Sequence, residues 1–365
     1  MSLETRFFDV VPHTAESLAI AIGATLHGNP QATVSGAAPF AEVQDGDLTF
    51  LADKAGAGDI PADAQAEMAA IVITTAALGD RLTGFAARLI VDRPRLGFAH
   101  AMTCLVPDTS PGMVTPADQN QDRFKGQDRS KGVVIGPGVM CGTSVKIGAG
   151  SRIDAGAIIH NGVEIGHNCH IGANSVLSHC TLGDDVTIQP NAVIGSAGFG
   201  FEITDDGPLQ LPHVGSVIIG NGVLIGAGCC IDRGTMGPTC IGDQAMLDNL
   251  VHVAHNCVIG ERAILTAQIG LAGGALIGAG AMMGGQAGVG PATRVGKGAV
   301  VMAQSGVTKD IEDGATVAGF PASDVRKMWR ERAAIRRLLA QSERPAKKPS
   351  EIKPSEIKPS EIKDD

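Results

Sequence analysis

A six-residue repeat of aliphatic residues runs through the second half of the chain. From Ile241 onwards every sixth residue is aliphatic, and the residue after it is usually glycine or alanine. The aliphatic positions are Ile241, Leu247, Val253, Ile259, Leu265, Leu271, Ile277, Met283, Val289, Val295, Val301 and Val307. A helix has a period of 3.6 and a flat strand a period of 2, so neither explains this spacing. Hexapeptide repeats predict a parallel β-helix, in which each short strand sends one aliphatic side chain inward and stacked coils bury the core together.

The same repeat is present earlier in the chain, with interruptions. It runs over 135–177, slips by one residue before Leu182, resumes at Ile219 and accommodates four extra residues around Gly237–Pro238. It is absent from 196–217, a segment with two phenylalanines and two prolines. We expect an ordered loop to leave the solenoid there, and loops on rigid scaffolds often carry function.

The remaining segments predict a domain plan. Residues 1–105 contain strand-like runs (AAIVIT, RLIVD) and helix-like runs, which indicate a small α/β domain, and the polar, turn-rich residues 106–131 indicate a linker. The solenoid is expected over 132–318, a basic helix over 319–342, and a disordered, proline-rich tail over 343–365. Only 3% of the residues are aromatic and 49 are glycine, a composition that suits short strands and tight turns.

Charge and hydropathy exclude several classes of protein. The net charge is −9, without a long basic run before the C-terminal region, so nucleic acid is not the expected partner. The first residues, MSLETRFFDV, lack the apolar core of a signal peptide, and no apolar run reaches the ~20 residues of a spanning helix. A cytoplasmic protein is therefore expected, and its eight cysteines, which form no CxxC pair, should be free thiols.

The predicted C-terminal helix is amphipathic and basic. Ser323 is the expected N-cap and Asp324 lies in the first turn. The apolar face consists of Val325, Met328, Trp329, Ile335, Leu338 and Leu339. The cations are Arg326, Lys327, Arg330, Arg332, Arg336 and Arg337. By itself the helix fits two interpretations, a solvated surface helix or a docking site for an acidic partner.

Several longer motifs narrow the comparison. They are GDLTFLAD (46–53), GFGF (198–201), IDRGTMGPTCIGD (231–243), LDNLVHVAHNCVIG (247–260) and GFPA (319–322). Together with the order of α/β domain, solenoid and helix, they resemble the UDP-3-O-(3-hydroxyacyl)glucosamine N-acyltransferases of lipid A biosynthesis. The resemblance implies a mainly β fold with a left-handed parallel β-helix, a uridine-binding N-terminal domain, and a homotrimer with active sites between neighbouring solenoids.

The resemblance also implies a reaction. A 3-hydroxyacyl chain on acyl carrier protein would be transferred to the 2-amino group of a UDP-3-O-acyl-glucosamine. No separate cofactor and no metal are expected, because the phosphopantetheine arrives on the carrier protein. With an acidic carrier as donor, docking becomes the favoured interpretation of the basic helix. The docking residues are then expected to be Arg326, Lys327, Arg330, Arg336 and Arg337.

The catalytic residues implied by the resemblance are His255, Asp248 and Gly273. His255 lies two residues past Val253, off the inward register, so it can face a cleft and accept a proton near neutral pH. Asp248 would orient and polarise the imidazole. If a coil is three hexapeptides long, Gly273 lies one rung away, at ~4.8 Å, where its amide could stabilise an oxyanion. The implied substrate-binding residues are Phe50, Asp53, Asn249, Phe199 and Gly200.

The chain departs from the family's pattern at three positions. Ala292 replaces a second histidine, Ala197 replaces the aspartate of GADGFGF, and Gly56 replaces the tyrosine that stacks on uracil. These changes should weaken nucleotide and donor contacts, and they leave open whether the acceptor is UDP-acyl-glucosamine or a related amino sugar.

Three other functions remain open at this point. A nucleotide-amino-sugar N-acetyltransferase using acetyl-coenzyme A would share the solenoid and the histidine. Zinc chemistry of the γ-carbonic anhydrase type would need histidines that converge between subunits, whereas His160, His167, His170 and His179 lie at scattered phases of the repeat. A trimeric scaffold with weakened or lost catalysis would fit the absent histidine and aspartate.

Overall fold

The structure of the protein is a computed structural model that describes residues 3–52, 68–117 and 132–342, without the side chains of 341 and 342. Residues 1–323 form one compact unit and a second unit begins at Asp324, so each is described by itself. The predicted tail over 343–365 and residues 118–131 of the predicted linker lie outside the described residues. The domain boundaries proposed from the sequence remain predictions.

The N-terminal part is a small α/β fold. Its five-stranded sheet has the order β2-β7-β6-β5-β4, with β2 antiparallel to β7 and the other pairs parallel. The elements are β1 (His13–Thr14), α1 (Ala15–Ile22), β2 (Thr25–Gly28), β3 (Thr33–Val34), β4 (Gly36–Ala37), η1 (Phe40–Glu42), β5 (Asp47–Leu51), β6 (Met68–Thr74), α2 (Ala76–Gly79), β7 (Phe85–Ile90), α3 (Pro94–Leu105) and β8 (Thr115–Pro116). Helix α1 begins after Thr14, whose hydroxyl accepts the Ser17 amide, and ends at Gly23 in the left-handed region. The expected strand-like and helix-like runs are therefore confirmed.

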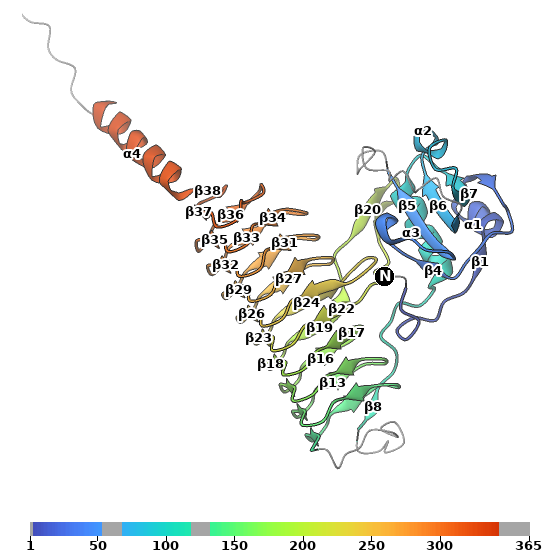
Figure 1. Ribbon diagram of the computed structural model, residues 1–365, viewed down its shortest axis with the longest axis horizontal. Helices are drawn as coiled ribbons and strands as arrows, with labels where there is room; N and C mark the ends of the chain where they lie inside the picture. Colours follow the sequence, from blue (N-terminus) through green and yellow to red (C-terminus); the bar gives the residue numbers. More distant parts are fainter. Residues whose placement is uncertain (1–2, 53–67, 118–131, 343–365) are drawn as a thin grey trace, which may run out of the picture. The chain divides into compact units, whose positions relative to one another are not determined.

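From β9 onwards the chain is a solenoid of very short strands in three parallel sheets (Figure 1). The sheet that carries the candidate site, here called the groove sheet, contains β10 (Met140–Cys141), β13 (Ile158–Ile159), β16 (Val176–Leu177), β19 (Val193–Ala197), β24 (Cys230–Arg233), β27 (His252–Val253), β30 (Gly270–Leu271), β33 (Gly288–Val289) and β36 (Gly306–Val307). The second sheet contains β11 (Lys146–Ile147), β14 (Glu164–Ile165), β17 (Cys180–Leu182), β22 (Val217–Ile219), β25 (Thr239–Ile241), β28 (Val258–Ile259), β31 (Leu276–Ile277) and β34 (Arg294–Val295). The third contains β9 (Val134–Ile135), β12 (Arg152–Ile153), β15 (His170–Ile171), β18 (Thr187–Ile188), β23 (Leu224–Ile225), β26 (Met246–Leu247), β29 (Ile264–Leu265), β32 (Met282–Met283), β35 (Val300–Val301) and β37 (Thr316–Ala318).

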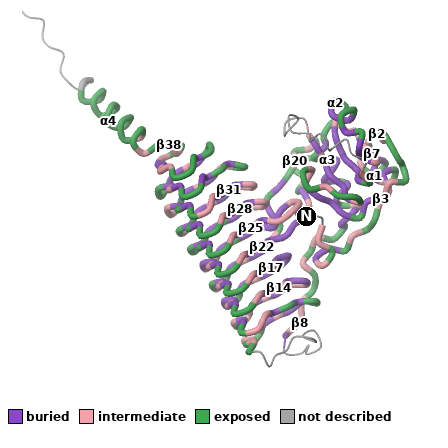
Figure 2. The backbone as a smooth tube through the Cα atoms, in the orientation of Figure 1, coloured by how far each residue is buried: buried purple, intermediate pink, exposed green. Residues whose placement is uncertain are grey.

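The aliphatic repeat is the core of this solenoid. In most strands of the solenoid the second residue points inward and is buried, while its neighbour is half-buried or exposed (Figure 2). In the regular coils the pairing register advances by 18 residues, as in His252 opposite Gly270. The predicted mainly β fold, a parallel β-helix of hexapeptide repeats, is confirmed.

Coil length varies where the sequence repeat is irregular. The single-residue slip appears as a 17-residue register between Glu164 and Thr181, and the four extra residues appear as a 22-residue register between Cys230 and His252. The interruption over 196–217 contains a hairpin of β20 (Phe201–Thr204) and β21 (Gly207–Gln210). The predicted loop therefore leaves the solenoid as an ordered hairpin.

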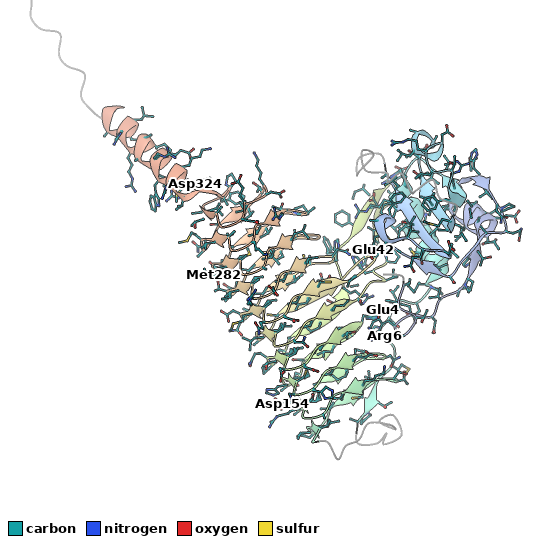
Figure 3. The ribbon with its side chains drawn as sticks, viewed as in Figure 1. Glu4, Arg6, Glu42, Asp154, Met282 and Asp324 are labelled. Carbon is teal, nitrogen blue, oxygen red and sulfur yellow. The ribbon has the colours of Figure 1, made fainter. Side chains whose placement is uncertain are left out.

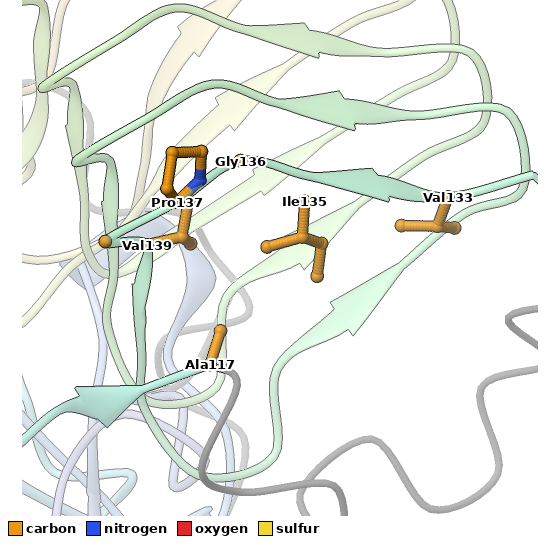
Figure 4. A pocket seen from close by; sticks show the side chains of 7 residues that line it. Ala117, Val133, Ile135, Gly136, Pro137 and Val139 are labelled. Atoms are coloured by element: carbon orange, nitrogen blue, oxygen red, sulfur yellow. The ribbon is translucent and has the colours of Figure 1, made fainter.

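The first coil borders a cavity of about 300 Å³ (Figure 4). Its lining consists of small and apolar residues, among them Ala117, Ile135 and Val139. None of the lining residues is titratable, so this cavity offers no acid–base chemistry.

The second unit contains helix α4 (Val325–Ser342), which follows the two-residue strand β38 (Ser323–Asp324). The N-cap prediction was wrong by one residue. Asp324, rather than Ser323, accepts the Lys327 amide through its carboxylate at 2.9 Å, because the helix begins at Val325 and Lys327 is its third residue. In the part of the chain that the structure describes, no helix is both long and apolar enough to cross a membrane.

Candidate active site

His255 lies in the tight turn between β27 and β28. The next residue, Asn256, has a left-handed backbone with φ of 59°. Asparagine adopts a left-handed backbone more readily than most residues, and the third residue of a type II turn must adopt this conformation. The turn brings the Asn256 side chain back against the imidazole, with 3.1 Å between Asn256 Oδ1 and His255 Nδ1.

This contact fixes the tautomer of His255. The Asn256 amide orientation is set by two backbone groups, because Oδ1 accepts the Thr235 N–H at 2.9 Å and Nδ2 donates to the Met236 carbonyl at 2.6 Å. An oxygen therefore faces His255 Nδ1, and this nitrogen must carry the hydrogen. The other ring nitrogen, Nε2, keeps its lone pair and can act as a base.

Gly273 lies on the next coil, directly against His255 Nε2. A Cβ atom built on Gly273 would lie 2.7 Å from both Nε2 and Cε1 of the ring, so any side chain there would displace the imidazole. The adjacent Gly274 amide donates to the His255 carbonyl at 2.9 Å, which holds the two turns in register. Among the described residues, the Gly273 amide has no acceptor of its own. The predicted one-rung spacing is confirmed, and a free N–H lies next to the candidate base.

The turn that contains Gly198 and Gly200 closes over His255 from another side. A Cβ on Gly198 would lie 2.9 Å from His255 Cβ and 2.8 Å from Nε2 of a second histidine, His213. Phe199 lies between these glycines. Its side chain is 84% exposed and, like His255, lines an open groove on the groove sheet. The predicted residues Phe199 and Gly200 are thus brought to the site, while Ala197 is exposed beside them.

An open groove of about 540 Å³ extends from His255 along the groove sheet. Four outward positions in successive strands, His252, Gly270, Gly288 and Gly306, form its floor. The three glycines provide no side chains, so this part of the sheet is bare. The far end is covered by Phe320, whose ring occupies the space that a Cβ on Gly306 would need. The groove is therefore polar beside the histidines and apolar along the glycines.

Two further polar residues near His255 were not identified from the sequence. Asp232 is 6% exposed, accepts the Ser196 hydroxyl at 2.8 Å and lies 3.9 Å from His252 Nε2. Burial raises the pKa of this carboxyl above its usual range. Asp232 belongs to the motif IDRGTMGPTCIGD and His252 to LDNLVHVAHNCVIG, so the available signal was a polar residue in each of two motifs that form adjacent strands.

Asp248 is not brought to His255 within one chain. It lies in the turn after β26, one strand before the turn of His255, and its carboxylate accepts the Asn249 amide at 2.7 Å. The Asn249 side chain also bonds within its own corner of the coil stack, where Oδ1 accepts the Ala227 amide at 2.8 Å. Both residues are exposed, so within one chain the neighbour of the imidazole is Asn256 and the predicted catalytic pair is separated.

The predicted nucleotide contacts are only partly described. Phe50 in β5 is half-buried and its ring centroid lies 4.9 Å from that of Phe98, so its ring already packs within the α/β fold. Asp53 and Gly56 lie outside the described residues. The predicted docking cations of α4 are all exposed: Arg326, Lys327, Arg330, Arg336 and Arg337.

The solenoid histidines that a zinc site would require have other contacts. His170 Nε2 lies 2.7 Å from the Asp154 carboxylate, and His179 stacks on Phe8 with ring centroids 4.8 Å apart. Within the ranges that the structure covers, no three histidine, cysteine or acidic side chains of one chain converge as a metal-binding group.

Comparisons with known proteins show what the sequence of the solenoid is similar to. Residues 144–179 match the family described as bacterial transferase hexapeptide (six repeats), and residues 216–249 match the hexapeptide repeat of succinyl-transferase. A UDP-3-O-acylglucosamine N-acyltransferase of Caulobacter vibrioides is 50% identical over 166 residues, which are 46% of this chain and 49% of that protein. The protein of the same name from Methylobacterium sp. (strain 4-46) is 34% identical over 169 residues, 46% of this chain and 48% of that protein.

The chain is a hexapeptide-repeat protein similar to these N-acyltransferases. The resemblance seen in the sequence motifs is thereby confirmed. The chain spans about half the length of the curated relatives it matches. Among solved structures, the UDP-N-acetylglucosamine acyltransferase from Campylobacter jejuni is 23% identical, with 57% of this chain and 85% of that chain covered and a TM-score of 0.47.

Proposed function

We propose that the protein is an N-acyltransferase that moves a 3-hydroxyacyl chain from acyl carrier protein to the 2-amino group of a UDP-3-O-acyl-glucosamine, a step of lipid A biosynthesis. The observation that carries the proposal is the His255 imidazole, whose tautomer leaves Nε2 free beside the Gly273 amide at the head of an apolar groove. The sugar and the N-linkage are those for which the similar proteins of Caulobacter vibrioides and Methylobacterium sp. are named.

The site can perform this transfer by general base catalysis. As the amine nitrogen attacks the thioester carbonyl, His255 Nε2 removes its proton, and the free Gly273 N–H donates to the carbonyl oxygen as negative charge develops there. Collapse of the tetrahedral intermediate breaks the C–S bond, and the imidazolium returns the proton to the leaving thiolate. Asn256 Oδ1 holds the Nδ1 hydrogen throughout and keeps the ring in one tautomer.

The groove is suited to the acyl chain. Its glycine floor covers three rungs from His252 to Gly306, which corresponds to ~14 Å at the spacing of parallel strands. An acetyl group would leave almost all of this surface uncovered, whereas a long acyl chain would bury it and gain ~25 cal/mol per Å² of apolar surface. The groove therefore favours a long-chain donor over acetyl-coenzyme A.

A homotrimer would complete the site. The third sheet carries an exposed apolar stripe in consecutive strands, formed by Met246, Ile264 and Met282, which are 47%, 38% and 47% exposed. Figure 3 labels Met282 on this stripe. Surfaces of this kind in soluble proteins often mark interfaces between subunits. A neighbouring copy packed there would also bring a second Asp248 near a His255, the pairing that a single chain does not provide.

Helix α4 provides a surface for the carrier protein. At ~100° per residue, Arg326, Arg330 and Arg337 fall within about 40° of one another on the helix. A cationic stripe of this kind steers an acidic partner and loses its effect at high salt.

We expect Arg326→Glu, Arg330→Glu and Arg337→Glu together to raise KM for acyl carrier protein several-fold at low salt, with kcat unchanged. Glu331→Lys serves as a control of opposite sign, and KM values that are equal in all variants at every ionic strength would rule out docking on this face.

The function is tested by offering donors and acceptors in competition. Purified protein is mixed with acyl carrier proteins bearing acyl chains of different lengths and with acetyl-coenzyme A, together with UDP-3-O-acyl-glucosamine and related UDP-amino sugars. Mass spectrometry should then detect an N-linked 3-hydroxyacyl product that is absent with His255→Ala. Exclusive acetylation would favour the nucleotide-amino-sugar N-acetyltransferase, and the absence of any product would favour a scaffold.

A further inference from the structure

A second histidine, His213, packs edge-on against His255. The ring centroids are 5.1 Å apart with an interplanar angle of 67°. His213 is only 1% exposed and does not line the groove, so it lies behind His255 and out of reach of a ligand in the groove. Buried polar atoms usually have a hydrogen-bond partner, whereas the Nε2 atom of His213 has none among the described residues.

The His213 ring is held by its surroundings on several sides. Its Nδ1 donates to the Leu211 carbonyl at 2.9 Å, and its own carbonyl accepts Arg233 Nε at 2.8 Å. Cβ atoms built on Gly198 and Gly200 would lie 2.8 Å from Nε2 and 2.9 Å from Cε1 of the ring. The imidazole therefore fills the space between the glycine turn and His255, and this space admits no other side chain of the turn.

The electrostatics keep His213 neutral. Burial, followed by the charge of His255, lowers the pKa of His213 to about 4. Since Nδ1 carries the hydrogen, Nε2 holds a lone pair, and this buried atom has no hydrogen-bond partner among the described residues. A neutral ring at this distance leaves His255 free to become positively charged, whereas a protonated one would oppose it.

We propose that His213 is a positioning residue for His255: a buried, neutral imidazole that fixes the His255 ring edge-on, so that Nε2 stays directed at Gly273. The proposal rests on the function proposed above for His255 as the base. It assigns a role to the buried His213 ring, which contacts His255 and makes no hydrogen bond through Nε2 within the described residues.

The test compares two substitutions at position 213 with a matched buried histidine. His213→Ala removes the ring and should lower kcat about tenfold while KM for the acyl donor stays within twofold. His213→Phe keeps a ring in contact with His255 and should restore kcat to within about threefold of the unsubstituted protein. His179→Ala is the control, because His179 is 2% exposed and also contacts Arg233, yet His255 is not among its contacts.

A second measurement does not depend on activity. In protein labelled with ¹³C at histidine Cε1, the His255 resonance, assigned with His255→Ala, should be a single sharp line. It should broaden or split in His213→Ala, because the ring samples several orientations, and sharpen again in His213→Phe.

The outcomes separate the two proposals. A sharp His255 line together with normal kcat in His213→Ala would overturn the positioning role. A fall in kcat that His213→Phe does not restore, or an equal fall in His179→Ala, would also overturn it, since either would indicate general destabilisation. Retained acyl transfer in His255→Ala would instead overturn the proposed role of His255 as the base, while the linewidths would still decide whether His213 orients the ring.

Discussion

The two halves of the groove sheet share one architecture but present different surfaces. In the first half, the outward positions of β10, β13, β16 and β19 carry Met140, Ile158, Val176 and Val193. In the second half, the equivalent positions after His252 carry glycine in three consecutive strands. The same hydrogen-bonded coils therefore give a surface covered by side chains in one half and a groove in the other. The candidate active site lies in the half whose strands carry glycine.

The histidines of the two halves differ in the same way. In the first half, His167 Nδ1 accepts the Ala149 amide at 3.0 Å and His170 pairs with Asp154, so these rings hold the solenoid together. In the second half, His255 uses only Nδ1 within the fold and keeps Nε2 at the groove. The His255 ring has this free nitrogen at a corner where the next coil offers Gly273 in place of a side chain.

The largest expected effect comes from removing the base. His255→Ala should lower kcat for acyl transfer by ~10²–10⁴-fold, the usual contribution of a general base, because Ala292 offers no second histidine. Asp248→Asn should cost less, because Asn256 already holds the His255 tautomer within the chain. Steady-state kinetics measure both.

His170→Ala is the matched control from the first half and should leave kcat unchanged. The melting temperature of His255→Ala should stay close to that of the unsubstituted protein, since the ring is not part of the aliphatic core. Comparable activity losses in the His170 and His255 variants would remove the distinction between the two halves.

The next effect concerns the bare floor of the groove. Gly288→Leu should reduce kcat/KM for long acyl donors tenfold or more and spare short ones, because a Cβ at Gly288 meets nothing within 4 Å and the side chain would extend into the groove. Val176→Gly, the reverse change in the first half, should leave donor preference unchanged. The measurement is the ratio of kcat/KM values across donors of different length, and an unchanged ratio in Gly288→Leu would mean that the acyl chain lies elsewhere.

A smaller effect concerns stability at acidic pH. Burial lowers the pKa of His179 to about 3 and that of His213 to about 4, both below the unfolded value near 6.5. Between pH 6.5 and 4 the unfolded chain binds protons that the folded chain does not, so stability falls as the pH is lowered through this range. Melting temperatures should therefore decline by a few degrees per pH unit below 6.5.

His179→Phe isolates the contribution of the first half to this pH dependence. The substitution should flatten the acidic slope, because a ring remains against Phe7 and Phe8 while the titrating group is removed. An identical slope in this variant would show that other groups control acid unfolding.

The coil architecture was predictable because a single rule repeats. The inward residues of the hexapeptide repeat after Ile135, such as Val253 and Leu271, are buried where the pattern placed them, and even the slip before Leu182 appears as a shorter register. The one-rung relation of His255 to Gly273 followed from the same 18-residue period. The regular repeat was therefore sufficient to predict most of the fold and the separation of His255 and Gly273 by one coil.

The rest of the site depends on irregular segments that a period cannot place. Thr235, which orients Asn256, belongs to the 22-residue coil, and His213 belongs to the loop that leaves the solenoid. Asp248, the partner of His255 that the family resemblance implies, lies at a different corner of the coil, and within one chain the two residues are not in contact. The glycines at 270, 288 and 306 were visible at 18-residue intervals, but they indicate a groove only when their strand faces outward beside His252.

The glycine floor has a consequence for how donor preference can change. Because Gly270, Gly288 and Gly306 lie on successive strands, the groove is divided into equal steps of ~4.8 Å. A substitution at Gly270 or Gly288, where a Cβ meets nothing within 4 Å, would shorten the groove by a whole step without altering the backbone. Under the proposed function, selectivity for chain length would therefore be discrete, and single mutations would move it from one value to the next while the turn that carries His255 stays the same.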